Sequence, residues 1–512
     1  MVLFASGADP STPRITFLEE PMSSDSPTGN AAQEKLGFWT KLGFGLGDIY
    51  GGGSGIVIGF YYLYFLTDVV RVDPALAGTV LLVSRIYDAI TDPFEGILTD
   101  RTRTRWGRRR PYLIAGAPLV LLSFFLLFYP VDFSSSGARF AFALATYLFF
   151  STVVSIVMLS YNALQAEMTL DYHERASLSS FRIFFSSLSS IVCAVVPLEI
   201  VNRFPDLRAG WIAMALVLAI YFAIPILVTG LLAHERTEFQ QPLTRINWRE
   251  GFVEPFRVRT YVFAILMYLL AFVAIDILSS IMVYFMKYYM GRGGETQWVS
   301  GALLVAQVLS LPIYSRLIRT ASKKRAYVVA TAGWMGLMLL SLLVTPALPS
   351  YVIYVYVVLI GLCTGGIVLS VYSILPDMPD VGELHTGKRQ EGTYSALWGF
   401  MRKLSSAFSL FLVGNLLSIA GYAAPVQQVA NGVSTLVEQP QSAGFILALR
   451  LVFAVVPLVF LGGGLYFAGR FPLTPELHQR LRLVLEARRA TGRADAQTDE
   501  EVAELTAILV GH

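Results

Sequence analysis

The run 75–98 contains two aspartates, Asp88 and Asp92, within a stretch that is otherwise largely apolar. In a helix, residues four apart share one face, and Arg85 lies on that face as well. Two carboxylates this close in a poorly solvated site repel each other, and a bound cation or a proton relieves the repulsion. Thr91 adds a neutral oxygen, and oxygen ligands suit Na⁺ or a proton better than a transition metal. The spacing predicts a cation site; a structural Arg85–Asp88 bridge without an ion is the alternative.

A lysine lies deep in a later apolar run. Lys403 stands well inside the run 393–420, and ionisable groups within membrane helices are costly and usually functional. We expect Lys403 to pair with Asp88 or Asp92 across a central cavity. The alternative is that its long side chain extends to the membrane interface.

Polar and aromatic side chains in other apolar runs could hold a solute by hydrogen bonds or stacking. The candidate substrate contacts are Asp48, Tyr50, Tyr161, Asn162, Gln165, Trp398 and Lys403. Aromatic residues in membrane helices also pack against one another or face lipid, and this remains the alternative for each of them.

An acidic cluster lies in the segment LPDMPDVGELHTGKRQEG, among loops rich in arginine. Ion pairs that form when one side of a carrier closes, and break when it opens, would make a gate. The candidate residues for gating or for a charge network are Arg85, Asp100, Asp377, Asp380 and Glu383. A fixed cluster of surface charge is the alternative.

The composition explains where these charges must lie. Hydrophobic residues make up 55% of the 512 residues and charged residues only 15%, whereas soluble domains carry roughly 25% charged residues. A bilayer core needs about 20 apolar residues per helix. Runs of this kind occur at 42–66, 75–98, 111–130, 139–164, 178–201, 210–233, 260–287, 297–316, 326–345, 351–375, 393–420 and 443–469. We therefore predict an all-α membrane protein with twelve transmembrane helices.

The loops indicate orientation and domain organisation. Arginine and lysine gather in the loops after the second, sixth and eighth runs, so those loops and both termini are expected to be cytoplasmic. The longest internal loop divides the runs into two pseudo-symmetric six-helix bundles. The expected parts are a disordered tail (1–40), a first bundle (41–233), a middle loop (234–259), a second bundle (260–470) and a cytoplasmic helix and tail (471–512).

The motifs FLTDVV, RIYDAITDP, DRTRTRWGRRRPYL, YNALQAEMT, DMPDVGE and RKLSSAF occur in an order that resembles the glycoside–pentoside–hexuronide:cation symporters of the major facilitator superfamily. The resemblance implies sugar transport coupled to Na⁺, Li⁺ or H⁺. It places the cation ligands at Asp88, Asp92, Thr91 and a hydroxyl near Ser155. Two acidic positions that bind galactosides in the family fall on Gly52 and Met158, which argues against a galactoside, although Asp48 lies one helical turn before Gly52. The expected substrate is a glycoside or related sugar.

The main hypothesis is thus a cation-coupled symporter that binds a small sugar and acts as a monomer in a plasma membrane, with a bacterial inner membrane expected. We expect neither a cofactor beyond Na⁺ or H⁺ nor a nucleic-acid partner, and the chain has no phosphate-binding loop for ATP. An alternative cargo is an amphiphile such as a lysolipid. The D-x-x-x-D spacing of DAITD also matches intramembrane prenyltransferases, which is the remote alternative.

Overall fold

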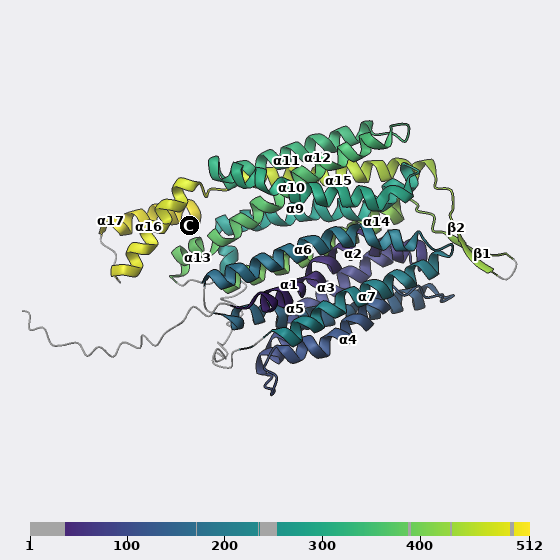
Figure 1. Ribbon diagram of the computed structural model, residues 1–512. Coiled ribbons are helices and arrows are strands. Elements are labelled where there is room, and N and C mark those ends of the chain that lie inside the picture. The colour runs from purple at the N-terminus through teal and green to yellow at the C-terminus, as the bar shows by residue number, and fades with distance from the viewer. Residues whose placement is uncertain are drawn as a thin grey trace, which may run out of the picture.

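Helices that run side by side along one axis make up most of the computed structural model (Figure 1). The structure describes residues 36–169, 172–233, 235, 253–387, 391–430, 433–491 and 496–511. Most of the expected tail (1–40) and most of the expected middle loop (234–259) lie outside these ranges.

The first half of the chain forms six helical columns. The first column is built from α1 (Phe38–Leu46), α2 (Asp48–Val57) and two π-helical turns, η1 (Ile58–Tyr62) and η2 (Phe65–Val69). The other columns are α3 (Pro74–Arg101), α4 (Arg110–Leu127), α5 (Ser136–Met168), α6 (Tyr172–Val201) and α7 (Leu207–Leu232).

The second half of the chain also forms six helical columns. Its columns are α9 (Arg259–Tyr284) with the π-helical turn η5 (Phe285–Tyr289), α10 (Thr296–Thr320), α11 (Lys323–Leu340), α12 (Ser350–Ile374), α14 (Glu391–Ile419) and α15 (Ala443–Arg470). Short 3₁₀ turns join some of them: η4 (Glu254–Arg257), η6 (Gly293–Glu295), η7 (Ser341–Leu343) and η8 (Leu375–Asp377). The twelve expected spans are therefore present among the described residues.

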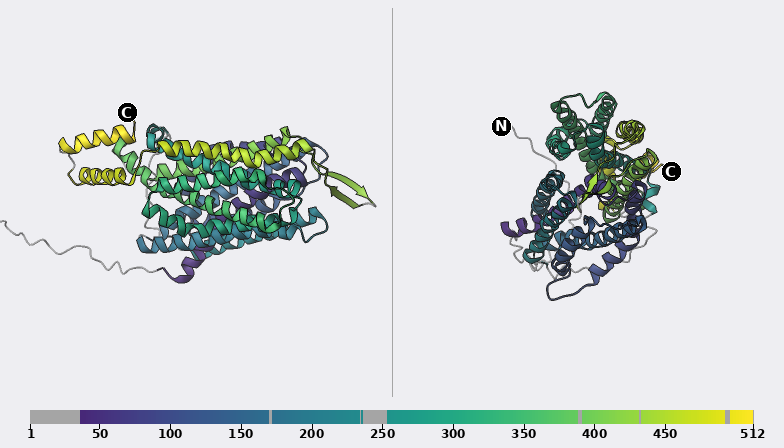
Figure 2. Two further views of the ribbon diagram at one scale, coloured as in Figure 1. Left: turned by 90° about the horizontal axis from the view of Figure 1, so that it is seen from above. Right: turned by 90° about the vertical axis from the view of Figure 1, so that its right-hand side faces the viewer.

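The two ends of the helical body differ. At one end, which we call the hairpin end, the antiparallel strands β1 (Val426–Ala430) and β2 (Val433–Val437) project beyond the helices (Figure 2). At the other end, which we call the α16 end, lie α13 (Met378–Thr386), α16 (Pro475–Thr491) and α17 (Ala496–Leu509). The sequence analysis did not predict the hairpin or a second C-terminal helix.

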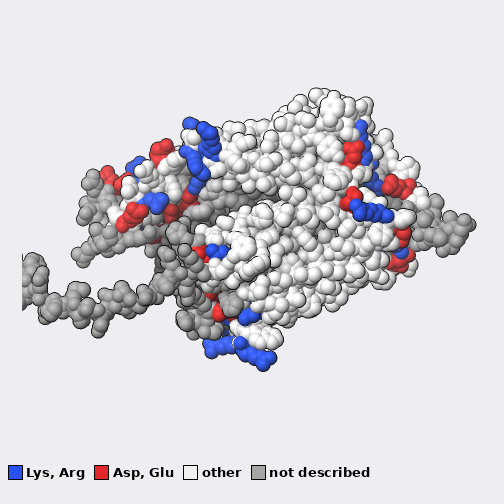
Figure 3. Space-filling model, in the orientation of Figure 1, with Lys and Arg blue, Asp and Glu red and all other residues white. Residues whose placement is uncertain are grey.

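Charge is distributed as a membrane protein requires. On the face drawn in Figure 3, Lys, Arg, Asp and Glu gather toward the two ends, and the band between them consists of other residues. Nine of the described helices are long and apolar enough to cross a bilayer. The columns outside this group are the first, which is divided into short helical pieces, and α3 and α14, which carry charges in mid-column. Charges on a span are tolerated where they face the interior of the bundle.

Glycines bring α3 and α14 into backbone contact near the hairpin end. A Cβ atom on Gly78 would lie 2.9 Å from the Cα of Phe411, and one on Gly414 would lie 2.3 Å from the carbonyl oxygen of Pro74. Small residues allow membrane helices to approach this closely. Because α3 belongs to the first half and α14 to the second, this contact joins the two halves. It also places the charged residues of α3 opposite those of α14.

Candidate functional site

Asp88 is the more deeply buried of the two aspartates predicted as cation ligands. Its side chain is 4% exposed, and the Arg85 Nη1 lies 2.6 Å from its Oδ2. The Ser151 hydroxyl on α5 donates to Oδ1 over 2.6 Å. Arg85 also donates to the Tyr147 hydroxyl over 3.4 Å. Asp88 thus has both an arginine partner on its own helix and a hydroxyl partner on the neighbouring one.

Asp92 links the two halves of the protein. The Lys403 Nζ, on α14, donates to Asp92 Oδ2 over 2.7 Å, and the Ser155 hydroxyl donates to Oδ1 over 2.5 Å. The side chains of Asp92 and Lys403 are 29% and 36% exposed, so this pair is far more accessible than Asp88. The Thr91 hydroxyl donates to the Tyr87 carbonyl over 3.2 Å, within its own helix. The structure thus brings Asp92, Ser155 and Lys403 together.

A second ion pair lies beside Lys403. Arg402 donates two hydrogen bonds to the carboxylate of Asp276 on α9, over 2.6 and 2.8 Å. Its guanidinium carbon lies 4.4 Å from the centre of the Phe272 ring. Bidentate arginine–carboxylate pairs are among the strongest in proteins. Asp276, for which the sequence suggested no role, therefore fixes the residue next to Lys403.

Glu95 is a buried acid that sequence reasoning missed. It lies on the same face of α3 as Asp88 and Asp92, seven and three residues beyond them. The residue is 6% exposed. Its two carboxylate oxygens are enclosed, and neither has a hydrogen-bond partner in the described part of the chain. Its helical spacing from the two aspartates was the signal that could have identified it.

Arg182, also missed, is the centre around which most of the predicted substrate contacts gather. It extends from α6 and lies 3.2 Å from Asp48 Oδ1. It donates to Asn162 Oδ1 over 2.8 Å and to Gln165 Oε1 over 2.6 Å. Its guanidinium carbon lies 4.7 Å from the centre of the Tyr161 ring. The structure therefore brings four candidate contacts from α2 and α5 together, and a lone arginine within the apolar run 178–201 was the available signal.

The remaining two predicted substrate contacts lie elsewhere. Tyr50 is fully buried, and its ring lies 5.5 Å from that of Phe222, between centres. Trp398 is 2% exposed, and its ring centre lies 4.4 Å from that of Tyr268. The Tyr50 hydroxyl and the Trp398 indole nitrogen have no hydrogen-bond partner within the described ranges. Both rings contribute to packing inside their own halves.

The predicted gate acids lie at the α16 end. Lys323 donates to Asp377 over 2.6 Å, and the His478 Nε2, on α16, lies 3.2 Å from Asp380 Oδ2. Glu383 is buried on α13. Arg85, predicted as part of the charge network, lies beside Asp88. Asp100 belongs to α3, but its side chain lies outside the described ones.

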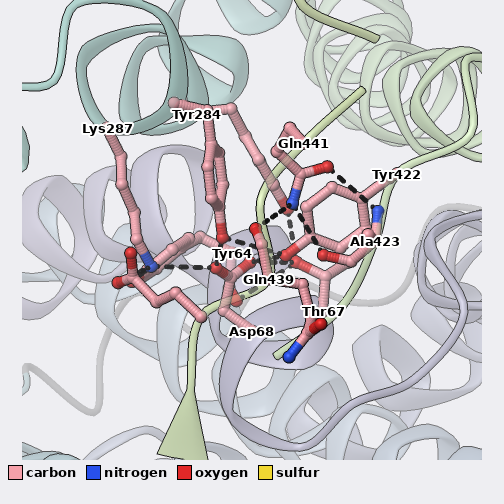
Figure 4. A network of polar contacts seen from close by, with 11 residues as sticks. Tyr64, Thr67, Asp68, Tyr284, Lys287, Tyr422, Ala423, Gln439 and Gln441 are labelled. Atoms are coloured by element: carbon pink, nitrogen blue, oxygen red, sulfur yellow. Dashed lines mark hydrogen bonds and ion pairs between the residues drawn. The ribbon is translucent and has the colours of Figure 1, made fainter. Parts of the chain in front are cut away.

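A network at the hairpin end joins the halves a second time. We call it the Asp68 clasp; it contains Tyr64, Thr67, Asp68, Tyr284, Lys287, Tyr288, Tyr422 and Glu438. Figure 4 shows most of these side chains converging on Asp68. Asp68 lies in η2 and is 0% exposed. In the sequence, Asp68 is visible only as part of the motif FLTDVV, because its partners come from distant segments.

Three residues of the second half hold the Asp68 carboxylate. The Lys287 Nζ donates to Oδ1 over 3.1 Å, the Tyr422 hydroxyl donates to Oδ2 over 2.6 Å, and Tyr288 also donates to Oδ1. Lys287 is in turn 2.9 Å from Glu438 in the segment that follows the hairpin. Arg450, the other charge without an expected role, donates to the Leu342 carbonyl over 2.9 Å at this end.

Comparison with known proteins places the whole membrane domain in one family. The family model described as MFS/sugar transport protein matches residues 43–475. The chain belongs to this family. It is accordingly a multi-pass membrane transporter with the major facilitator fold, and it is not an enzyme, which excludes the prenyltransferase alternative.

Individual relatives are similar over nearly their full length. An uncharacterised symporter of Synechocystis sp. is 29% identical, with 89% of this chain and 98% of the relative covered. The isoprimeverose transporter of Lactiplantibacillus pentosus is 27% identical, with 82% and 86% covered. The sodium-dependent lysophosphatidylcholine symporter 1-A of Danio rerio is 24% identical, with 92% of each covered.

Proposed function

We propose that this transporter couples the entry of a glycoside or related sugar to the movement of a cation, Na⁺ or H⁺, by alternating access. The observation that carries the proposal is the Asp92–Lys403 pair. It joins a carboxylate of the first half to an ammonium of the second at 2.7 Å, and both groups are partly exposed. A cation that reaches Asp92 competes directly with Lys403 for the same oxygen.

This competition links ion binding to the arrangement of the two halves. When a cation neutralises Asp92, Lys403 loses its partner, and one of the contacts that join α3 to α14 is removed. A ligand can shift an equilibrium between states only if it binds them differently. The cation meets this condition because the Asp92 oxygen is free in one arrangement and occupied by Lys403 in the other.

The sugar site in this proposal surrounds Arg182. The guanidinium, Asp48, Asn162 and Gln165 supply the donors and acceptors that sugar hydroxyls need, and the ring of Tyr161 supplies an apolar face. Gly52 packs against α6 one turn from Arg182, since a Cβ atom at position 52 would lie 2.3 Å from the Ser186 hydroxyl oxygen. The family's sugar-transport description and the isoprimeverose-transporting relative support this class of substrate.

The orientation follows from the charge of the loops. We place the α16 end in the cytoplasm because the arginine-rich segment after α3 lies there, and positive loops remain inside. On this placement the Asp68 clasp faces outward. The membrane is the plasma membrane, a bacterial inner membrane, and the carrier acts as a monomer.

The decisive experiment is transport by the purified protein in sealed lipid vesicles. Vesicles receive an inward gradient of either Na⁺ or protons, and accumulation of labelled isoprimeverose, xylose and a β-glucuronide is measured. We expect one of these sugars to accumulate above its outside concentration with one of the gradients. Sugar entry that only equalises the two sides under both gradients would refute symport.

A lysolipid is the second candidate cargo, because the lysophosphatidylcholine symporter is similar over 92% of both chains. The same vesicles distinguish the two cargoes when labelled lysophosphatidylcholine is added. Na⁺-dependent transfer of this lipid, together with no response to any sugar, would replace the sugar proposal.

A further inference from the structure

The segment 101–110, which joins α3 to α4, contains six arginines, and the structure divides them into two sets. The last three are held inside the protein. Arg108 and Arg109 both pair with Glu167 on α5. Arg110 donates to the Gly230 carbonyl at the end of α7 over 2.9 Å. These three arginines therefore fasten the segment to the first half.

The first three arginines of the segment have no such role. Arg101, Arg103 and Arg105 are exposed, and none of them has a carboxylate partner among the residues that the structure describes. We call the part of the segment that carries them, residues 101–107, the arginine turn. It presents three positive charges that the described part of the protein does not neutralise.

The exposed side of α3 leads directly to the arginine turn. Ile86, Ile90, Phe94 and Leu98 are each more than half exposed and follow one another at intervals of four residues. They lie on the side of the helix that faces away from the buried Asp88. Because the charges of a membrane helix face the interior of the bundle, this apolar stripe faces lipid. The first exposed arginine follows the end of the stripe within one helical turn, at the level where lipid headgroups begin.

The arginine turn also presents a tryptophan. The Thr104 hydroxyl donates to the Gly107 carbonyl over 2.7 Å, and the Trp106 N–H donates to that hydroxyl over 3.2 Å. Trp106 is 51% exposed, and the guanidinium carbon of Arg105 lies 5.2 Å from the centre of its ring. Tryptophan is enriched at membrane–water interfaces, because its ring is apolar and its N–H is polar. The turn thus combines an interfacial ring with exposed cations.

These features match the headgroup region of a membrane. A guanidinium binds phosphate oxygens through two parallel N–H groups, and anionic lipids attract arginines that lie next to the membrane. The acids of the second half at this end do not compete, because Asp377 and Asp380 already have partners on α11 and α16. A partner that satisfies both the charges and the ring is an anionic lipid.

We propose that the arginine turn binds the headgroup of an anionic phospholipid in the leaflet at the α16 end. Arg101, Arg103 and Arg105 hold the phosphate, and Trp106 lies beside the first carbons of the acyl chains. The basic segment 316–325 of the second half provides an internal comparison, since it has exposed arginines but no aromatic residue. That segment attracts anionic lipid weakly, through charge alone.

Lipid binding to the purified full-length protein tests the proposal. The protein in a non-ionic detergent is titrated with phosphatidylglycerol, and with phosphatidylcholine of the same acyl chains as the reference. Native mass spectrometry counts the bound lipids. We expect phosphatidylglycerol to bind more tightly than phosphatidylcholine. Equal affinities for the two lipids would overturn the proposal.

Two triple variants separate a site from diffuse attraction. One replaces Arg101, Arg103 and Arg105 by Gln, and since each arginine near an anionic surface contributes about a fivefold factor, phosphatidylglycerol should bind about a hundredfold more weakly. The control makes the same replacement at three exposed arginines of the segment 316–325, namely Arg316, Arg319 and Arg325. It removes the same charge and should weaken binding far less. Equal losses in the two variants overturn the site. If the first variant does not fold, Arg103→Gln replaces it, with an expected loss of about fivefold.

Two further measurements identify the ligand. Trp106→Ala keeps every charge and should still weaken phosphatidylglycerol binding several-fold, whereas an unchanged affinity would overturn the role of the ring and with it the proposed site. Inorganic phosphate at millimolar concentration should not displace the lipid. Displacement would mean that the arginines bind a free anion, and would overturn the lipid proposal. None of these measurements uses transport, so their outcome is independent of the proposed function.

Discussion

Asp68 and Asp92 both join the first half of the protein to the second, yet their surroundings differ. Asp68 is fully buried and receives hydrogen bonds from Lys287, Tyr288 and Tyr422. Asp92 is 29% exposed, has one lysine and one serine as partners, and lies near Glu95, whose carboxylate has no hydrogen-bond partner in the described part of the chain. A carboxylate whose acceptor sites are filled by fixed donors holds two helices together. One with open sites and a neighbouring acid is suited to exchange its partner for an ion.

This contrast gives the two regions different tasks. In the proposed mechanism, the Asp68 clasp holds the two halves together at the hairpin end, and the Asp92 region is where a cation acts. The separation is useful in a carrier, because the ion can then change the interaction between the halves without reaching the buried Asp68 carboxylate.

Asp92→Asn should abolish cation-driven accumulation, because an amide cannot bind the cation or pair with Lys403 as a charge. The measurement is sugar uptake into vesicles under an ion gradient. Stability should change less than it does for Asp68→Asn, since the released Lys403 is 36% exposed and can be hydrated. Asp132→Asn is the control, because it removes an exposed ion pair, the one that Asp132 forms with Arg71 and Arg208, and leaves Asp68 and Asp92 untouched. Normal accumulation by Asp92→Asn would remove Asp92 from the mechanism.

Asp68→Asn should cause the largest loss of stability. Removing one member of a buried ion pair costs about 3–5 kcal/mol. Lys287 would then keep only the exposed Glu438 as a carboxylate partner among the described residues. Thermal unfolding of the purified protein reports the change. A labelling reagent should also reach a cysteine placed at the hairpin end more readily once the clasp is broken. If the unfolding midpoint of this variant equals that of Asp132→Asn, the clasp does not hold the halves together.

Tyr422→Phe should have an intermediate effect, because it deletes one hydrogen bond to the Asp68 carboxylate and leaves the ring packing in place. A hydrogen bond to a charged group contributes about 1.5–3 kcal/mol. The change is measured in the same unfolding experiment, with Tyr466→Phe, at an exposed tyrosine of α15, as the control. Equal midpoints for the two variants would show that the other donors already satisfy Asp68.

Glu438→Gln should have the smallest effect. Its side chain is 63% exposed, and solvent-exposed ion pairs contribute roughly 0–1 kcal/mol. The small destabilisation that we expect should disappear at high salt, because salt screens exposed charges. A loss as large as that of Asp68→Asn would mean that the hairpin segment, and not Asp68, closes this end.

The spans and the first acidic pair were accessible from the sequence because their signals are local. Apolar runs of membrane length are contiguous, and a spacing of four residues places Asp88 and Asp92 on one helix face whatever surrounds them. Glu95 obeys the same rule, so its place on this helix face was also accessible from the sequence. The expectation that Lys403 needs a carboxylate likewise followed from the cost of a buried charge.

What the sequence determined by itself is therefore the number of membrane spans, the basic loops and the presence of charges that must face an interior. Only the tertiary structure decided which charges meet. Arg182 collects residues of α2 and α5, Asp68 is held from two segments of the second half, and the Glu95 carboxylate has no hydrogen-bond partner within the described ranges. Each of these facts depends on how helices distant in the chain are rotated and offset against one another. Helix periodicity specifies a face but not the neighbour that the face meets.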